Sequence, residues 1–226
     1  MHRNTTHIDC FVPYLNKEQA SLTIKSLQAT GRVNAIYLLH HEPVPEAGHQ
    51  VLITPAVHHS DTLKAIHRVL KTDYFLSCFR NEPRDFENDS LQQMAERAAD
   101  NSWIFSDYWA IENGQKTEAP LADHQSGSVR DDFDLGAVAL IRSDSLRQYL
   151  QESLLNMQEW QYSAWYALRM FVLAQGEGNI CRLPQMLYTV MESDLRKSGE
   201  KQFDYVNPRN REVQLERERV FTLFLI

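Results

Sequence analysis

The residues best suited to chemistry in this chain lie in one short segment, 127–136, which carries three carboxylates and one guanidinium between two glycines. The charged residues are Arg130, Asp131, Asp132 and Asp134. Carboxylates this close raise one another's pKa unless a cation or hydrogen-bond donors neutralise them, and one arginine cannot serve all three. A divalent metal or a polyhydroxylated ligand is the natural partner. The alternative is an acidic turn that its own Asp side chains cap locally.

The composition favours one α/β domain and argues against a binder of nucleic acid or membrane surfaces. The chain has 226 residues, 43% of them hydrophobic, which is enough for one sizeable core. Its formal net charge of -7 would repel phosphate backbones and anionic lipids. Neither a secretion signal nor a membrane-spanning window is recognisable. Cys10, Cys78 and Cys181 are odd in number and far apart, so we expect a soluble protein with reduced thiols in the cytoplasm.

Short apolar runs alternate with helical patterns, which is typical of a sheet built largely from βαβ units. The runs predict strands at 8–13, 33–40, 50–54, 73–79, 103–111 and 136–142. The helical patterns fall at 17–30, 60–71, 85–100, 144–156 and 160–175. Asn113 and Gly114 predict a tight turn at 112–115, followed by a loop through 115–130. A last extended segment runs from Arg182 to Val190.

The C-terminal segment 207–226 predicts a further helix, with Asn207 as N-cap and Pro208 in the first turn. Its final residues are apolar and must dock on the body of the protein, on another subunit or on a following domain. We therefore expect residues 1–206 to form the main domain, and we expect the sequence to be part of a longer chain.

The order of these elements, with several sequence segments, resembles the family-2 inverting glycosyltransferases of the glycosyltransferase-A fold. The segments include an apolar strand that leads into Pro13, Tyr14 and Asn16, and the acidic run 127–136. The others are 103–108, 182–189 and 196–201. The set is most similar to a branch of the family common in Bacteroidetes and covers about 8–200. It implies a central mixed, mostly parallel sheet flanked by helices.

The resemblance implies transfer of a sugar from a nucleotide-diphosphate donor to a glycan or lipid-linked acceptor, in cell-envelope polysaccharide synthesis at the inner membrane. Such enzymes bind the donor at the carboxyl ends of the first strands. The donor-binding residues expected here are Pro13, Tyr14, Asn16, Glu42, Thr54, Asp107 and Arg130. Tyr14 is also explained as a half-buried aromatic residue that packs on the first helix. Manganese or magnesium is the cofactor that the family would use.

The chain departs from the family at two positions that carry chemistry. The fourth strand should end in Asp-x-Asp, whose carboxylates hold the metal that clamps the diphosphate, but 74–81 contains no carboxylate. The catalytic base should open the helix before the last strand, where Tyr162 and Ser163 stand instead.

Two interpretations follow from these departures. In the first, one acid of Asp131, Asp132 and Asp134 is the catalytic base, with Asp132 the leading candidate because it is flanked by like charge, and Asp131 and Asp134 hold the metal. In the second, the protein binds nucleotide or sugar, or docks a partner, without catalysing transfer.

Two further groups of residues have both a functional and a structural interpretation. Arg196 and Lys197 would cover the cleft as a lid whose charges suit phosphate oxygens and replace the metal, or they form an exposed, solvated loop.

The paired histidines near the ends of strands two and three, His40–His41 and His58–His59, each offer the cleft one side chain only. We therefore expect these histidines to be hydrogen-bonded or exposed. Trp160 and Trp165 are first of all core residues, although either could stack on an acceptor sugar.

Overall fold

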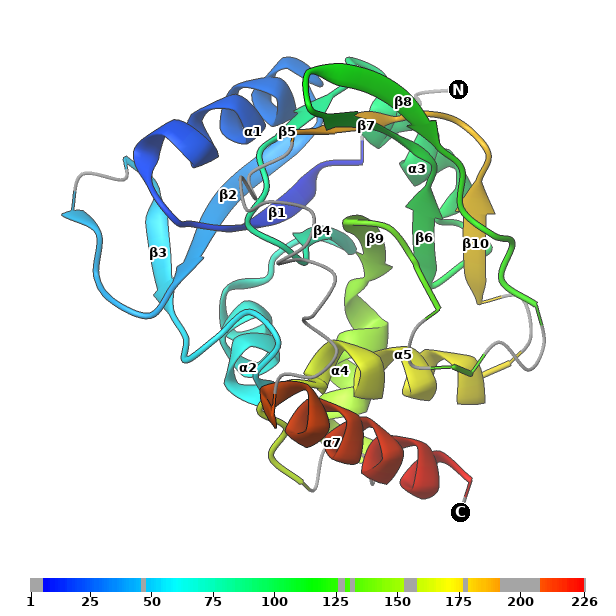
Figure 1. Cartoon of the computed structure of the whole chain (residues 1–226). Coiled ribbons are helices and arrows are strands. Elements are labelled where there is room, and N and C mark those ends of the chain that lie inside the picture. The colour runs from blue at the N-terminus through cyan, green and yellow to red at the C-terminus, as the bar shows by residue number, and fades with distance from the viewer. Residues whose placement is uncertain are drawn as a thin grey trace.

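The computed structural model describes residues 6–45, 48–125, 129–130, 133–152, 158–176, 179–191 and 208–225. Its centre is a seven-stranded sheet in the order β10-β6-β9-β4-β1-β2-β3 (Figure 1). The strands are β1 (Ile8–Pro13), β2 (Val33–His40), β3 (Gln50–Ile53), β4 (Tyr74–Cys78), β6 (Trp103–Ser106), β9 (Val138–Arg142) and β10 (Ile180–Leu183). Strand β9 is antiparallel to its neighbours β4 and β6, and the other pairs are parallel. The mixed, mostly parallel sheet is confirmed.

A second sheet of four strands, β5-β11-β7-β8, lies against the first. Its strands are β5 (Arg84–Phe86), β11 (Tyr188–Met191), β7 (Tyr108–Glu112) and β8 (Gln115–Ala119). The single strand predicted over 103–111 is therefore wrong, because β6 and β7 belong to different sheets. The chain leaves the first sheet at Asp107, whose backbone N–H donates to the Leu183 carbonyl at 3.2 Å.

The sequence pattern misses strands β5 and β8 for different reasons. Strand β8 lies in the predicted loop because its residues are polar and mostly exposed, so no alternation of apolar residues marks it. Strand β5 lies where the helix at 85–100 was expected, but helix α3 (Ser90–Arg97) begins only at Ser90. Phe86 instead packs its ring against Tyr188, with the ring centroids 5.7 Å apart. The tight turn is confirmed, with positive φ at Asn113 and Gly114.

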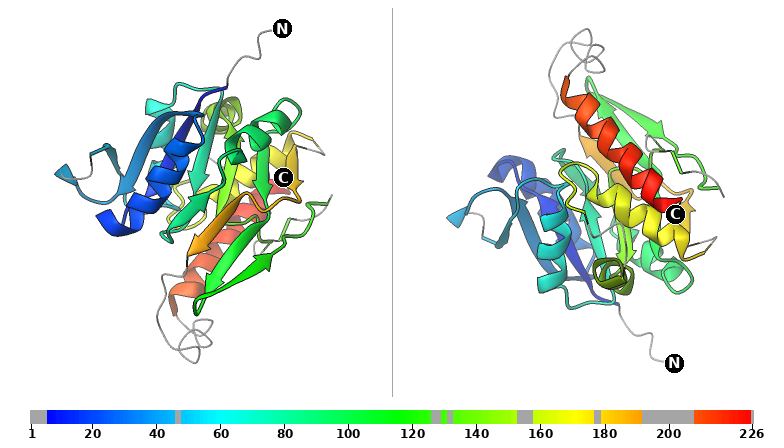
Figure 2. Two further views of the ribbon diagram at one scale, coloured as in Figure 1. Left: turned by 90° about the horizontal axis from the view of Figure 1, so that it is seen from above. Right: turned by 90° about the horizontal axis from the view of Figure 1, so that it is seen from below.

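Helices cover both faces of the large sheet (Figures 1 and 2). On one face lie α1 (Lys17–Ala29), α3 and the second sheet. On the other lie α2 (Ser60–Val69), α4 (Ser143–Glu152), α5 (Ala164–Ala174) and α7 (Pro208–Phe224). Neighbouring residues of β1 serve different cores, because successive side chains of a strand point to opposite faces: Phe11 packs with the α2 side and Val12 with the α1 side. Within the described residues, no helix is long and apolar enough to cross a membrane.

Helix α5 begins at Ala164 rather than at the predicted 160, because the preceding residues are tied to the start of α2. The Trp160 backbone N–H donates to Ser60 Oγ at 2.9 Å, and the Trp160 carbonyl accepts from the Ser60 backbone N–H at 2.8 Å. The Ala164 N–H donates to the His58 carbonyl at 3.1 Å. These bonds bring the 158–163 segment and the β3–α2 connection to the same end of the sheet.

Helix α7 runs alongside α5, as Figure 2 shows from two sides. Val220 of α7 is fully buried in the core on the α5 side. The Glu216 carboxylate is also buried and accepts hydrogen bonds from the backbone N–H groups of Gln161 and Tyr162, at 3.1 and 2.8 Å. The described part of the helix therefore docks on the body of the protein. Asn207, the expected N-cap, lies outside the described residues, and a following domain remains a prediction.

Candidate functional site

A groove follows the carboxyl ends of β2, β1 and β4. Its first hollow lies beside Tyr14, His40 and Thr54, and it shares Val57 and Asn81 with a second hollow. The second hollow shares His58, Phe79 and Arg80 with a wider cleft of about 440 Å³. The three hollows therefore lie in a row, each beside the next, along the end of the sheet where ligands bind in open α/β folds.

The first hollow brings together two of the predicted donor-binding residues, Tyr14 and Thr54. Tyr14 donates its backbone N–H to the Leu39 carbonyl, and its half-buried ring meets His40 edge to face, with centroids 5.8 Å apart. The buried Thr54 donates its backbone N–H to the His40 carbonyl at 2.9 Å. The flat face of Tyr14 and the polar groups beside it suit a nucleoside base and ribose.

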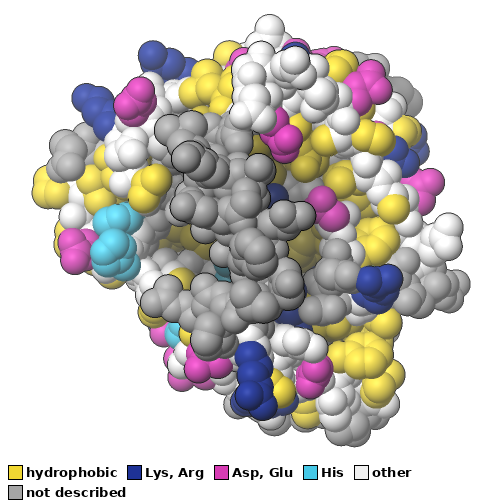
Figure 3. All heavy atoms as spheres, viewed as in Figure 1, with side chains coloured by type: hydrophobic (Ala, Val, Ile, Leu, Met, Phe, Trp, Pro, Cys, Tyr) yellow, Lys and Arg dark blue, Asp and Glu magenta, His cyan; other side chains and the backbone are white. Residues whose placement is uncertain are grey.

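The other residues predicted for this end have local roles in the structure. Pro13 is buried in β1, and its carbonyl accepts from Gln19 Nε2 at 3.4 Å. Asn16 is the N-cap of α1, where its side chain accepts from the Gln19 N–H at 2.8 Å. Glu42 is exposed, and its Oε1 lies 3.7 Å from His41 Nε2. Exposed histidine side chains gather on the β3 side of the molecule (cyan in Figure 3).

At the end of β4, where the family pattern calls for Asp-x-Asp, the structure places Phe79, Arg80 and Asn81. The Phe79 N–H donates to the Ala137 carbonyl at 3.0 Å, which fixes this loop to the residue before β9. The fully buried Arg84 donates from Nη2 to the Arg80 carbonyl at 2.9 Å and from Nη1 to the Glu82 carbonyl at 2.6 Å. A buried guanidinium thus shapes the loop that carries Arg80 into the groove.

The wide cleft is lined by more cations than anions. Arg80 enters from the β4 end, Arg169 from α5 and Arg217 from α7. Of the described residues that line it, Asp134 is the one carboxylate. The surrounding protein lowers the pKa of His58, Arg217 and Arg80 lower it further, and a hydrogen bond to the Phe79 backbone partly offsets both. The lowered pKa leaves His58 neutral at pH 7. The three guanidiniums, set against one carboxylate among the described lining residues, favour an anionic ligand in the cleft.

Asp134 is the predicted site residue that the structure places in this cleft. Its carboxylate is exposed, and Oδ1 accepts from the Gly136 N–H at 2.8 Å. Gly136 has φ +77, and a Cβ there would lie 2.8 Å from the Tyr188 hydroxyl, so only glycine fits. Local capping, the structural interpretation of this run, is therefore real for Asp134, while its second carboxylate oxygen remains available to a ligand.

Arg169 holds the backbone of the acidic segment and was not anticipated. It is 4% exposed, and its guanidinium donates to the Phe133 carbonyl at 3.2 Å and to the Arg130 carbonyl at 2.6 Å. It also stacks on Tyr166, with its Cζ 4.8 Å from the ring centre. The signal in the sequence is a single cation inside the apolar run of α5, because a buried charge must have partners. Arg130, predicted to bind the donor, lines a smaller hollow between α5 and α7 that shares Tyr166 and Arg217 with the cleft.

At the place expected for the catalytic base, Tyr162 lines the cleft and Ser163 is buried before α5. Trp165, the second residue of α5, also lines the cleft and is 5% exposed, with Nε1 donating to the Val57 carbonyl at 2.8 Å. Trp160 is 1% exposed in the core. The core assignment of both tryptophans is confirmed.

Asp107, predicted to bind the donor, lies in a buried ion pair instead of along this groove. Arg182 donates to its two carboxylate oxygens at 2.7 and 2.6 Å, and the Leu121 N–H also donates to Oδ1. Arg182 further contacts Asp123 at 2.9 Å, and these bonds hold its pKa above the usual value. The pair joins β6, β10 and the 121–123 segment. Asp131, Asp132, Arg196 and Lys197 lie outside the described residues.

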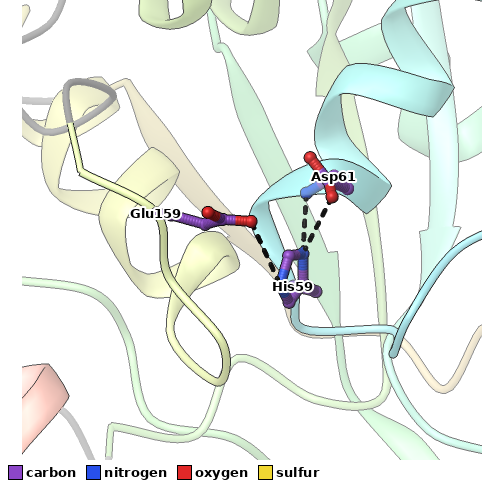
Figure 4. Close-up of side chains that lie close together, drawn as sticks. All are labelled: His59, Asp61 and Glu159. Atoms are coloured by element: carbon purple, nitrogen blue, oxygen red, sulfur yellow. Dashed lines mark hydrogen bonds and ion pairs between the residues drawn. The ribbon is translucent and has the colours of Figure 1, made fainter.

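His59, Asp61 and Glu159 form a cluster that resembles a metal site (Figure 4). His59 Nδ1, however, accepts the Asp61 backbone N–H at 3.0 Å and so caps α2. A neutral ring with this bond carries its proton on Nε2, which faces Glu159 at 3.6 Å. A metal bound at Nε2 would displace the proton to Nδ1, and Nδ1 could then no longer accept the Asp61 N–H. The cluster is therefore better explained as a capped helix start. His40, whose Nδ1 lies 3.1 Å from the Glu42 backbone nitrogen, is likewise hydrogen-bonded.

Comparisons with known proteins bear on the fold. A scan of protein-family models and a search of curated proteins find no match. Among solved structures, the chain is similar to residues 1–349 of the S. aureus glycosyltransferase TarS, with TM-score 0.58 and 10% identity over 95% of this chain and 77% of that one. The same TarS segment in complex with UDP-GlcNAc aligns with TM-score 0.57 and 12% identity, over 97% and 71% of the two chains. The protein has a glycosyltransferase-A-like fold.

In this glycosyltransferase-A-like fold, the groove lies where the carboxyl ends of the parallel strands meet the segment that leads into the antiparallel strand β9. The identity with TarS is too low to transfer residue roles, so the groove must be interpreted from its own side chains. An aromatic end, a cationic middle and one exposed carboxylate in the described part of the cleft are the features that a function has to explain.

Proposed function

We propose that the protein transfers a sugar from a nucleotide-diphosphate donor to an acceptor hydroxyl, as an inverting glycosyltransferase. The observation that carries this proposal is the row of neighbouring hollows from Tyr14 and Thr54 to the cleft that holds Arg80 and Asp134. In order, these hollows offer the aromatic face of Tyr14 for a nucleoside base, guanidiniums for a diphosphate, and a carboxylate that could accept the proton of the acceptor hydroxyl. The TarS structure with UDP-GlcNAc supports a nucleotide-sugar as the class of donor.

In the proposed reaction, the acceptor oxygen attacks the anomeric carbon while the bond from that carbon to the diphosphate oxygen breaks. One carboxylate takes the proton of the acceptor hydroxyl, and the nucleoside diphosphate leaves with the electron pair. We assign the base to the acidic run: Asp134 faces the cleft, and Asp132 is the residue that the sequence favours. The acceptor is proposed to be a glycan or a lipid-linked sugar of the cell envelope, used at the inner membrane.

Whether the manganese or magnesium ion of the family takes part depends on oxygen ligands in the groove. These ions prefer carboxylates and water, and the end of β4 offers a guanidinium, an amide and a phenyl ring. Asp134 is one carboxylate, and its Oδ1 already accepts the Gly136 N–H. The Glu82 carboxylate is paired with Arg84, with Oε2 3.4 Å from Nη2. The described residues therefore do not fit a dicarboxylate metal site, and no step of the proposed reaction uses a metal.

A binding module without transfer activity is the second candidate, favoured by Tyr162 and Ser163 at the expected position of the base. Two measurements separate the candidates. Thermal unfolding with UDP, GDP, CDP and ADP at millimolar concentration tests binding, because a ligand of the folded state alone raises its stability. Release of nucleoside diphosphate from nucleotide-sugars tests chemistry. Binding with no turnover for any common donor would favour the module, and no stabilisation by any nucleotide would count against both candidates.

A further inference from the structure

Two arginines from distant parts of the chain enter the same cleft. Arg80 follows β4 and is exposed, and Arg217 belongs to α7 and is half-buried. His58 lies with them in the cleft, and both guanidiniums lie close enough to lower its pKa. The cleft follows directly on the hollow at Asn81, which in turn adjoins the aromatic end beside Tyr14.

We propose that Arg80 and Arg217 form a metal-independent clamp for the diphosphate of a nucleotide-sugar, with His58 of the same cleft as a hydrogen-bonding group. This inference rests on the proposed function and names how the leaving group is held. Guanidinium groups present paired N–H donors that match phosphate oxygens, and Arg80 stands at the position where the family's metal ligands would stand. The charge that a metal would supply therefore comes from the protein.

The fold fixes the backbone from which each guanidinium extends. The loop of Arg80 is held by Arg84, which bonds to the Arg80 and Glu82 carbonyls from within the core. Helix α7 is held by Glu216, the residue before Arg217, through two hydrogen bonds to the 161–162 backbone. Adjacent helical residues point in different directions, so Glu216 faces that backbone while Arg217 faces the cleft. Only the two side chains then have to be ordered when an anion binds, which lowers the entropy cost of binding.

The clamp makes the C-terminal helix part of the donor site, and it gives α7 a role beyond closing the core. Arg217 also lines the neighbouring hollow between α5 and α7, where the partly buried Tyr166 and Phe221 lie beside Gln214 and Glu218. A ligand that reaches the cleft from the aromatic end would therefore meet Arg217 only when α7 is docked.

The experiment measures binding of UDP, GDP and inorganic pyrophosphate by titration calorimetry in EDTA and in manganese. Arg80→Gln and Arg217→Gln should each weaken diphosphate binding by about tenfold or more, because each removes a charge-assisted hydrogen bond. Binding of the corresponding nucleosides should not change, and EDTA should not weaken binding to the parent protein. Arg80→Lys should restore part of the affinity, since it keeps the charge but loses the fork.

Arg219→Gln is the matched control, because Arg219 is an exposed arginine of the same helix and carries the same charge. Its binding should equal that of the parent protein. A melting curve of every variant separates loss of binding from loss of folding, and the exposed Arg80 tests the clamp even if Arg217→Gln loosens α7.

The outcomes distinguish the clamp from the proposed function. If diphosphates bind the parent protein but EDTA abolishes binding, or both Arg→Gln variants bind as tightly as Arg219→Gln, the clamp is wrong while a nucleotide-sugar transferase remains. If no nucleotide binds the parent protein in either buffer, the proposed function fails as well. Metal-independent binding that is lost selectively in the Arg80 and Arg217 variants supports both.

Discussion

The Glu216 carboxylate of the C-terminal helix accepts the backbone N–H of Tyr162 at 2.8 Å, and the same side chain also accepts the N–H of Gln161. This bond joins the end of the chain to the segment that precedes α5 and lines the cleft. Because the Glu216 carboxylate is buried, these two N–H groups supply the hydrogen bonds that its charge requires.

Glu216→Ala should therefore lower the free energy of unfolding by about 1–3 kcal/mol, the usual contribution of hydrogen bonds to a charged group. Urea unfolding followed by circular dichroism measures the change. Glu218→Ala, at an exposed position of the same helix, should change it by less than about 0.5 kcal/mol. Equal effects of the two substitutions would show that the Glu216 contacts carry no stability.

Gly136 makes the turn that aims Asp134 into the cleft. A side chain there would adopt an unfavourable φ of +77 and would overlap the Tyr188 hydroxyl, which accepts the Ala137 N–H at 3.1 Å. Gly114, at φ +75, has no neighbouring atom within 4 Å of the position that a Cβ would take, and it is the control for backbone strain alone.

Gly114→Ala should cost about 1–2 kcal/mol of stability through its φ. Gly136→Ala should cost about 1–3 kcal/mol more, through overlap with Tyr188. Thermal and urea unfolding of both variants measure the difference. If the two substitutions were equally destabilising, the contact with Tyr188 would not constrain this turn.

The sequence predicts the large sheet well because its strands are buried on both faces and read as continuous apolar runs, as in Phe75 and Leu76 of β4. It does not show where a strand changes sheet: the apolar pattern continues past Asp107, and the bend there depends on long-range bonds to Leu183 and Arg182. Strand β8 is polar, so tertiary pairing with β7 rather than local pattern decides its structure.

The site was only partly accessible to sequence reasoning. Tyr14, Thr54 and Asp134 were recognisable from strand ends and a charged turn, and the structure places each of them along the groove. Arg169 is marked in the sequence as a lone cation in an apolar run, but its partners are not, and Arg217 reaches the cleft from a helix about fifty residues further along the chain. Charge patterns on a helix do not show which residues a docked helix turns toward a neighbour.

His58 should respond to a bound diphosphate. The surrounding protein, Arg217 and Arg80 lower its pKa from 6.5, so the unfolded chain binds a proton more readily than the folded one. His58 therefore reduces stability as the pH falls through about 6.5 toward its folded pKa, and this loss disappears at higher pH. Other charged groups of the cleft are Arg169 and Asp134.

A diphosphate between Arg80 and Arg217 adds negative charge beside the imidazole, so it should raise the pKa of His58. The C–H signals of His58, identified with His58→Gln, can be followed by NMR over pH 4.5–8 with and without pyrophosphate. The signals of His7, exposed before the amino end of β1, should not change with pyrophosphate. A pKa of His58 that does not change at saturating pyrophosphate would place the anion elsewhere.

The last prediction concerns the catalytic base. Asp134→Asn keeps the oxygen that caps the Gly136 N–H and removes the negative charge, so the turn should persist while proton removal is lost. If Asp134 is the base, the turnover number should fall by about a hundredfold or more with little change in donor binding. If Asp132 is the base, Asp132→Asn should have that effect instead.

Transfer and donor hydrolysis are measured by release of nucleoside diphosphate. Asp100→Asn is the control, because Asp100 is an exposed acid that precedes β6, at the opposite edge of the sheet. Parent rates in both the Asp132 and Asp134 variants would exclude these two acids as the base and leave Asp131 to be tested.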